Sequence, residues 1–405
     1  MDFTLSPEIE ALRVKVRAFV EEHVLPLESD PHNFSEHENI PDERLAPVRE
    51  KAKKAGLWAP QSPKEYGGMD LPMVAWAVMY EEAARSLFGP LAFNCMAPDD
   101  GNMNLLKKAG TPAQKEKWLK PIVEGKVRSS VVMTEPAPGG GSDPSMIKTY
   151  AEKHGNTYKI YGRKWFITGA AAASHFILAA RTSDDKRKGI TTFLYHKDQP
   201  GWRITRRIPI LGPEEHGGHC ELEFDGLEVH EDDILGGIGN VLKMVQVRLG
   251  PARLTHCMRW TGWAKRCMEI AQEYVNRREG FGVRLADRES VQMKLGELHA
   301  EALAAVHVLL RDLHAAFRPA EPAHAMRQAR RAEPHLHHLQ AVADAAKDVV
   351  LVDLEAVELE LAMTAVLLRT HDVDAAHDAP AGLILVKEKR RKPAPLIVRL
   401  SLIHI

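Results

Sequence analysis

The chain has 405 residues, an apolar fraction of 44% and a formal net charge of −1. A chain of this length and composition can bury a large core, and its near-zero charge gives no global attraction to nucleic acid or anionic lipid. The four cysteines show no CxxC spacing, no charged-then-apolar leader precedes the first helix, and no run of about 18 apolar residues occurs. These features predict a reduced, cytoplasmic protein without a membrane span.

Residues 1–127 are predicted to form a helical domain. The segment from Ser6 reads S-P-E-I-E-A-L, which places a serine cap before a proline and puts acids in the first turn. A second helix is predicted over 112–124, with Thr111 as its cap. A third is predicted over 73–86, where apolar residues recur at helical spacing on one side, at Met73, Trp76, Ala77 and Tyr80.

Residues 128–237 change to short apolar or alternating runs, which predict a middle β domain. From residue 238 helical spacing returns. It predicts a long helix that passes Pro251 and ends near Asn276, and a second helix from about Ser290. We therefore expect the order helical, β, helical, in which residues 238–316 begin a C-terminal helical bundle and residues 317–405 form a tail of different composition.

The stretch VVMTEPAPGGGSDPSMIKT, residues 131–149, follows an apolar strand and combines a Thr-Glu-Pro turn with three glycines. Glycines let backbone N–H groups approach a ligand closely, and hydroxyls add hydrogen-bonding groups. A cofactor loop is one interpretation. A solvated linker or plain turn is the other.

Seven motifs in order make the chain resemble the acyl-CoA dehydrogenase family, and most of all the bacterial enzymes related to the human acyl-CoA dehydrogenase 10 and 11 branch. The resemblance covers roughly residues 1–316. The motifs are GLWAPQSPKEYGG (56–68), FNCMAPDDGNM (93–103), MTEPAPGGGSD (133–143), GRKWFITGA (162–170), HCELEFDGLEVH (219–230), LGPARLTHCMRW (249–260) and RREGFG (277–282).

The resemblance implies the acyl-CoA dehydrogenase architecture, mainly α with a central β-barrel-like domain, and FAD as cofactor between the β domain and the bundle. In the family a carboxylate removes the α-proton of an acyl-CoA thioester while the β-hydrogen leaves as hydride. Substrate and flavin must therefore be stacked and kept dry. The implied function is α,β-dehydrogenation to the 2-enoyl-CoA, with electrons passed to an electron-transfer flavoprotein.

Site residues follow from the resemblance, motif by motif. Met133 and Thr134 would meet the pyrimidine edge of the flavin, and Ser142 would lie where phosphate or the CoA arm passes. Phe166, Ile167 and Thr168 come from the strand that covers one ring face, with Thr168 reaching toward N5. Arg253 matches the substrate-side arginine, and Arg278 matches the arginine that reaches the FAD diphosphate, often across a subunit boundary. The added residues between Pro136 and Ser142 leave the flavin partners after Pro136 unassigned.

Structural interpretations stand beside these assignments. Arg278 is alternatively a solvated helix-end residue, and Arg253 a residue of a helix N-terminus. KWFIT alone is an ordinary strand, in which alternation predicts Trp165 and Phe166 on opposite faces. His216, His219 and Cys220 invite a zinc site, but alternation predicts His219 and Cys220 on opposite faces too, so we assign no metal.

Beyond residue 316 the family's Gly-Gly-x-Gly segment and its acidic base are not recognisable, and Gly382 is the only glycine after residue 300. Some relatives place the base just before the substrate-side arginine, but that position is Ala252. The acids at 353, 355, 358 and 360 are interpreted as a solvated face, and the histidines of 335–338 and 371–377 are given no metal role. The catalytic base is therefore unassigned, and weak FAD retention is predicted.

Three explanations of the tail compete: a divergent helical domain, a natural gene remnant, and a lost reading frame. The change in composition and the closing LSLIHI, which resembles translated adapter sequence, favour the last. Homodimers or homotetramers are expected from the family. Two rival functions stay open: an acyl-CoA oxidase or flavin monooxygenase on the same fold, and a non-catalytic acyl-CoA-binding remnant.

Overall fold

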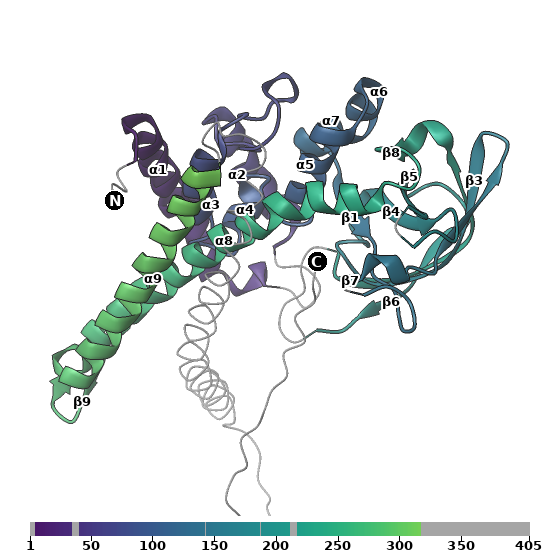
Figure 1. Ribbon diagram of the computed structural model, residues 1–405. Coiled ribbons are helices and arrows are strands. Elements are labelled where there is room, and N and C mark those ends of the chain that lie inside the picture. The colour runs from purple at the N-terminus through teal and green to yellow at the C-terminus, as the bar shows by residue number, and fades with distance from the viewer. Residues whose placement is uncertain (1–4, 35–39, 142, 187, 211–216, 317–405) are drawn as a thin grey trace, which may run out of the picture. The chain divides into compact units, whose positions relative to one another are not determined.

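The computed structural model describes residues 5–34, 40–141, 143–186, 188–210 and 217–316 (Figure 1). These residues belong to one compact unit. Along the described residues a helical region is followed by a β region and then by two long helices. This is the order that the sequence predicts.

The α-helices are α1 Pro7–Phe19, α2 Asp42–Lys54, α3 Met73–Ala83, α4 Gly89–Ala92, α5 Asp99–Ala109, α6 Pro112–Gln114, α7 Lys120–Val123, α8 Val241–Arg277 and α9 Glu289–Ala316. Short π and 3-10 segments join several of them. These are η1 Val20–Val24, η2 Leu25–Ser29, η3 Pro31–Asn33, η4 Lys64–Tyr66, η5 Lys115–Leu119, η6 Pro144–Met146, η7 Glu231–Asp233 and η8 Leu285–Asp287.

The β region forms one sheet in the order β6-β7-β3-β2-β4-β5-β8, with β1 paired to β4. Most pairs are antiparallel, whereas β1 and β2 run parallel to β4. A separate two-stranded hairpin follows α8. The strands are β1 Arg128–Val132, β2 Tyr150–His154, β3 Thr157–Thr168, β4 Ala173–Arg181, β5 Ile190–His196, β6 Trp202–Ile208, β7 His219–His230, β8 Ile234–Leu235, β9 Glu279–Gly280 and β10 Val283–Arg284.

Both predicted helix starts are confirmed. The Ser6 hydroxyl accepts a hydrogen bond from the Ile9 backbone N–H, and Pro7 occupies the first position of α1. At the start of α6, the Thr111 hydroxyl accepts from the Gln114 N–H while the Gln114 side chain accepts from the Thr111 N–H. This reciprocal capping box satisfies two backbone donors that helix geometry leaves unpaired.

Helix α3 is shorter and more deeply buried than its apolar pattern predicts. It ends at Ala83 rather than at 86, and the buried residues run without interruption from Ala75 to Ala83. Glu82 is fully buried. Its burial is tolerated because the carboxylate lies within ion-pair distance of Arg13, Arg17 and Lys265 from α1 and α8. Buried carboxylates need such partners, and a one-sided apolar stripe could not reveal them.

Helix α8 crosses α3 at Gly262. A Cβ at this position would lie 2.2 Å from the Glu81 carbonyl oxygen and 2.9 Å from the Ala84 Cβ. The glycine therefore lets the two helix backbones approach closely. The first part of α8 packs on α5 and the later part on α9, so one continuous helix links the β-domain end of the unit to the hairpin β9–β10 (Figure 1).

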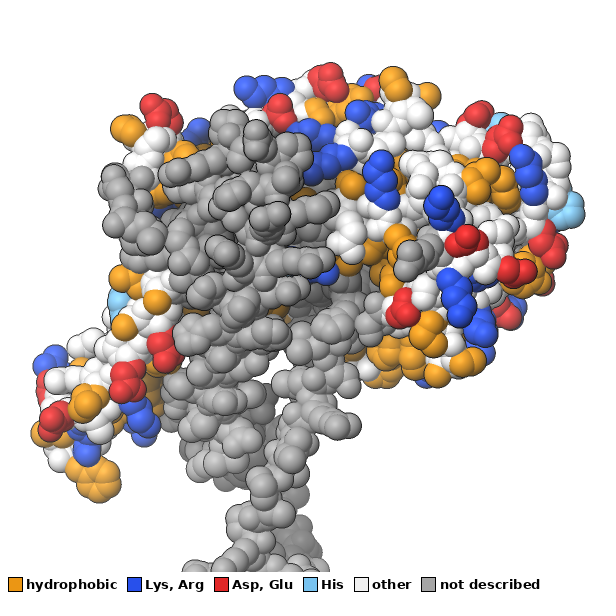
Figure 2. Space-filling model, viewed as in Figure 1, with side chains coloured by type: hydrophobic (Ala, Val, Ile, Leu, Met, Phe, Trp, Pro, Cys, Tyr) orange, Lys and Arg blue, Asp and Glu red, His pale blue; other side chains and the backbone are white. Residues whose placement is uncertain are grey.

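The β domain has its own core of inward-facing side chains. Phe176 and Tyr195 stack with ring centroids 4.7 Å apart, and Trp202 and Phe224 complete the aromatic cluster. Figure 2 shows acidic and basic side chains interspersed over this domain on the face in view. Within the described residues, no helix has the length and apolar character needed to cross a membrane.

Candidate active site

A buried ion pair joins the loop after β1 to strand β3. The Lys164 ammonium lies 2.8 Å from the Glu135 carboxylate, and the two side chains are 0% and 3% exposed. Lys164 also donates to the Met133 carbonyl at 2.9 Å, and Glu135 accepts from the Lys148 and Thr149 backbone N–H groups. These contacts fix the loop against β3.

Both members of this pair are charged at neutral pH. Burial lowers the pKa of Lys164 to about 8, against the opposing attraction of Glu135. Burial alone would raise the pKa of Glu135, but Lys164 and the two backbone N–H groups lower it overall.

Two of the three loop glycines are explained by packing inside the loop. A Cβ on Gly139 would lie 2.4 Å from the Glu135 carboxylate, and one on Gly140 would lie 2.9 Å from the Ile147 side chain. The Glu135 N–H donates to the Gly140 carbonyl and closes the turn. Gly141 is exposed and has no atom within 4 Å of its Cβ position, so packing inside the loop does not require a glycine there.

Thr134 presents free hydrogen-bonding groups at the edge of this loop. Its carbonyl accepts from the Trp165 N–H at 3.0 Å. Its hydroxyl and its own N–H make no hydrogen bond with any described residue, and the residue is half-buried. Half-buried polar groups of this kind can hydrogen-bond to water or to a ligand.

The prediction that Trp165 and Phe166 point to opposite faces is wrong. The register between β3 and β7 shifts between Lys164 and Ile167, and Phe166 adopts a left-handed φ of 51°. The bulge breaks the alternation, and the two rings meet edge to face with centroids 4.8 Å apart. A non-glycine residue in this conformation is uncommon, and such residues often lie at functional positions.

Regular pairing resumes after the bulge. Ile167 pairs with Cys220 and Thr168 with His219. The Ile167 side chain is 1% exposed within the β core, so it is not available to a ligand. The Thr168 hydroxyl lies 3.1 Å from Nδ1 of His219. His219 and Cys220 face opposite sides as predicted, since Cys220 is fully buried and His219 is not.

A polar cluster, buried apart from the half-buried Arg128, joins α5, β1 and α8, and we call it the α5–α8 cluster. Its charged members are Asp99, Asp100, Arg128, Arg248 and Arg259, and its neutral members are Asn102, Ser129 and Thr255. Asp99 accepts from the Ser129 N–H and hydroxyl, both at 2.7 Å, and pairs with Arg128. Asp100 accepts from Arg259 at 2.9 Å and from Thr255 at 3.0 Å.

One face of α8 faces this cluster. Arg248, Ala252, Thr255 and Arg259 recur at helical spacing and are all buried. Ala252, the position where some relatives carry the base, has only its methyl group there. Burial would raise the pKa of Asp100, but Arg259 and Thr255 lower it overall. A carboxylate held ionised by such donors is a weak base, so we assign no catalytic base among the described residues.

The two predicted arginines lie far apart. Arg253 is exposed near the start of α8 and pairs with no described residue, whereas Arg278 is the exposed residue that ends this helix. Twenty-five residues of α-helix separate them, which is about 37 Å. The structure therefore does not bring Arg278 together with Met133, Thr134 and Arg253 within one copy of the chain.

Several predicted features lie outside the described residues. These are Ser142, His216 and everything from 317 onward, including the histidine clusters and acids of the tail. Among the residues that the structure does describe, no group of three or more His, Cys, Asp or Glu side chains is placed to hold a metal ion.

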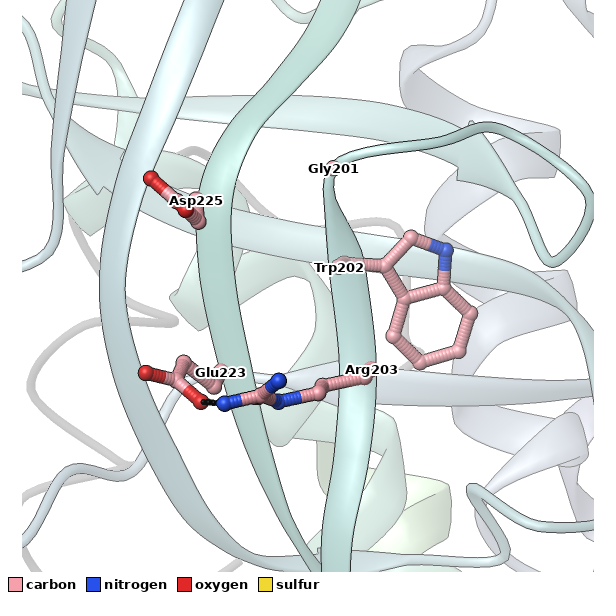
Figure 3. Close-up of a pocket in the computed structure, with 5 residues that line it drawn as sticks. All are labelled: Gly201, Trp202, Arg203, Glu223 and Asp225. Atoms are coloured by element: carbon pink, nitrogen blue, oxygen red, sulfur yellow. Dashed lines mark hydrogen bonds and ion pairs between the residues drawn. The ribbon is translucent and has the colours of Figure 1, made fainter.

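A surface pocket of about 250 Å³ lies on β6 and β7, between Gly201, Trp202, Arg203, Glu223 and Asp225. Arg203 reaches across β7 to Glu223, while Trp202 projects from the opposite side of β6 (Figure 3). The pocket contains none of the predicted site residues, and its one ion pair satisfies its arginine. We give it no role in the chemistry.

Sequence reasoning missed the residues that support the site. Glu135 and Lys164 stand inside the quoted motifs, but their pairing depends on a contact 29 residues apart in the chain. Arg248 and Arg259 could have been found from the spacing of polar residues along the buried face of α8. Asp99 and Asp100 had a signal as well, because two adjacent acids begin a helix that is otherwise apolar on one side.

Comparisons with known proteins agree with this architecture. Models of the N-terminal, middle and C-terminal domains of acyl-CoA dehydrogenase match residues 6–126, 130–227 and 242–347. The last match extends beyond residue 316, where the recognisable motifs end. The family generally binds FAD.

The similar proteins carry names from this family. "Probable acyl-CoA dehydrogenase FadE2" of Mycobacterium tuberculosis is 35% identical over 310 residues, which cover 74% of this chain and 75% of that protein. Human acyl-CoA dehydrogenase family member 11 is 33% identical over 297 residues, 70% of this chain but only 38% of the longer human protein. The structure of butyryl-CoA dehydrogenase from Megasphaera elsdenii superposes with a TM-score of 0.66 at 26% identity and covers 77% of this chain and 80% of that chain. The chain belongs to the acyl-CoA dehydrogenase family.

Proposed function

We propose that the chain catalyses FAD-dependent α,β-dehydrogenation of an acyl-CoA thioester to the 2-enoyl-CoA and passes the electrons to an electron-transfer flavoprotein. The observation that carries the proposal is the loop at Thr134. Its carbonyl is bonded to β3, while its hydroxyl and N–H are left free. The Lys164–Glu135 pair holds the loop in place from behind.

These residues fit a flavin. The free groups of Thr134 suit the donor and acceptor pattern of the pyrimidine edge, whereas the carbonyl of Met133 is already taken by Lys164. Phe166 lies at the bulge with its ring against Trp165. At this position its ring can cover one face of the flavin. Thr168 holds its hydroxyl beside His219, and His219 orients it.

When bound, FAD supplies the acceptor for the hydride that leaves the β-carbon. The protein's share is orientation, exclusion of water and removal of the α-proton. Thr134, Phe166 and Thr168 would orient the flavin. Arg278 would reach the diphosphate of a second copy, because α8 carries it about 37 Å from Arg253. This geometry supports a homo-oligomer.

The test is an anaerobic titration of the FAD-loaded chain with saturated acyl-CoA thioesters. Loss of the visible flavin absorbance, followed by its return on adding electron-transfer flavoprotein, supports the dehydrogenase. Rapid return on adding air alone indicates an oxidase instead. Thr134→Val removes one hydrogen-bonding group and should weaken FAD binding roughly two- to tenfold. Thr205→Val, an equivalent change at an exposed position of β6, should leave it unchanged.

A second candidate is an acyl-CoA-binding protein without turnover. The observation that favours it is Ala252, which offers no proton acceptor on the buried face of α8. A chain that binds acyl-CoA and FAD yet never bleaches the flavin would establish this alternative and exclude the dehydrogenase.

A further inference from the structure

Arg248 is the one arginine of the α5–α8 cluster that has no carboxylate partner among the described residues. It is 5% exposed, and its Nε donates to the Asn102 side-chain oxygen at 2.9 Å. Its two Nη groups make no hydrogen bond with any described residue. A guanidinium carries five N–H donors, so most of its hydrogen-bonding capacity is unused.

The cluster as a whole carries one excess positive charge. Three arginines stand against two aspartates, and each aspartate already pairs with one of the other two arginines, Arg128 and Arg259. Neighbouring groups do not change this balance. Burial lowers the pKa of His256 to about 4, so it is neutral at pH 7, and Arg49 has its own partner in Asp42.

Arg248 stays charged despite its burial. Burial lowers its pKa to about 10, which is still well above neutral pH. A buried charge without a counter-ion destabilises a protein strongly unless something pairs with it. Gly101 lets the guanidinium pack closely on α5, because a Cβ at this position would lie only 3.3 Å from the guanidinium carbon.

The position of Arg248 on α8 indicates which anionic group of an acyl-CoA the guanidinium would bind. It lies four residues before Ala252 on the same buried face of α8. In some relatives the position of Ala252 carries the base that takes the α-proton, and this resemblance would place the same face beside the acyl group rather than the CoA phosphates. A guanidinium binds a carboxylate through two parallel hydrogen bonds.

We propose that Arg248 binds a carboxylate on the acyl group of the substrate, so that the chain prefers acyl-CoA thioesters bearing a second carboxyl group. This inference rests on the proposed function, because it assumes that an acyl-CoA thioester occupies the site. It adds the class of acyl group that the site selects.

The test measures binding rather than turnover. Calorimetry on the FAD-loaded full chain would compare two non-reactive CoA thioethers of equal length, one ending in a carboxylate and one in a methyl group. We expect the carboxylate analogue to bind about tenfold more tightly or better. In Arg248→Gln this preference should disappear, and in Arg248→Lys, which keeps the charge but loses the paired geometry, it should be reduced.

The matched control is Arg203→Gln, which removes an exposed arginine from β6. Arg203→Gln should keep the full preference for the carboxylate analogue. This control separates recognition by Arg248 from a general attraction of the anionic analogue to positive charge on the chain. If the methyl analogue binds as tightly as the carboxylate analogue to the unmodified chain, the inference fails while the proposed function stands. If neither analogue binds, both fail. The comparison on the unmodified chain decides the matter even where Arg248→Gln does not fold.

Discussion

The buried pair Lys164–Glu135 offers a direct test of how the loop is held. Lys164→Met removes the ammonium but keeps most of the side-chain volume, and it leaves Glu135 buried without its counter-ion. Breaking a buried pair in this way costs about 3–5 kcal/mol. Glu135 keeps its two backbone N–H partners, so we expect a loss near the lower end, about 3 kcal/mol. The same change should weaken FAD binding, because Lys164 also holds the Met133 carbonyl.

The assay is chemical denaturation followed by far-UV circular dichroism, with the free energy of unfolding taken from the shift of the β-domain transition. Lys153→Met is the matched control. It makes the same substitution in an exposed pair with Glu231 at 3.3 Å, where a loss of about 0–1 kcal/mol is expected. If Lys164→Met costs no more than Lys153→Met, the reasoning about the loop is refuted.

The pH dependence of the same pair has a definite sign. The folded pKa of Glu135 lies below its usual 4.5, so the ionised carboxylate stabilises the fold above about pH 4.5. This contribution is lost as the pH falls through the folded pKa. The difference in unfolding free energy between the unmodified chain and Glu135→Gln should therefore shrink as the pH falls below about 4.5. A difference that grows in acid would contradict the assignment.

Three further predictions concern other parts of the chain. Asp100→Asn leaves Arg259 buried without its carboxylate, and we expect a loss of about 3–5 kcal/mol in denaturation experiments; a loss below about 1 kcal/mol would show that the Cys95 carbonyl suffices as a partner. Thr111→Ala removes the capping box of α6 and should cost about 1 kcal/mol, measured as a shift of the denaturation midpoint. Arg278→Ala should weaken FAD binding without lowering stability, and unchanged binding in fluorescence titrations would place the diphosphate elsewhere.

The order of elements could be predicted from the sequence because periodicity and caps are local signals. Ser6 and Thr111 lie within three residues of the groups that they cap, and Pro251 did not interrupt the helical pattern that continues to Arg277. The supporting parts of the site could not be predicted. Lys164 reads as one polar residue in an alternating strand, and nothing local shows that it is fully buried.

The bulge at Phe166 escaped prediction for a related reason. Alternation assumes an unbroken ladder, whereas the register of β3 on β7 changes between Lys164 and Ile167. The glycines of the loop illustrate a further limit, because a sequence shows that close approach is possible but not what is approached. At Gly139 the neighbour is Glu135 of the same loop rather than a ligand.

The close crossing at Gly262 couples the position of the buried face of α8 to a residue well removed from the α5–α8 cluster. Gly262 lies ten residues beyond Ala252 on α8, about 15 Å along the helix axis. Any added side chain would collide with the Glu81 carbonyl, and α8 would have to tilt or slide to make room. Because Arg248 and Ala252 belong to the same helix, they would be displaced together with it. A side chain at position 262 is therefore expected to displace Arg248 and Ala252 although it touches neither of them.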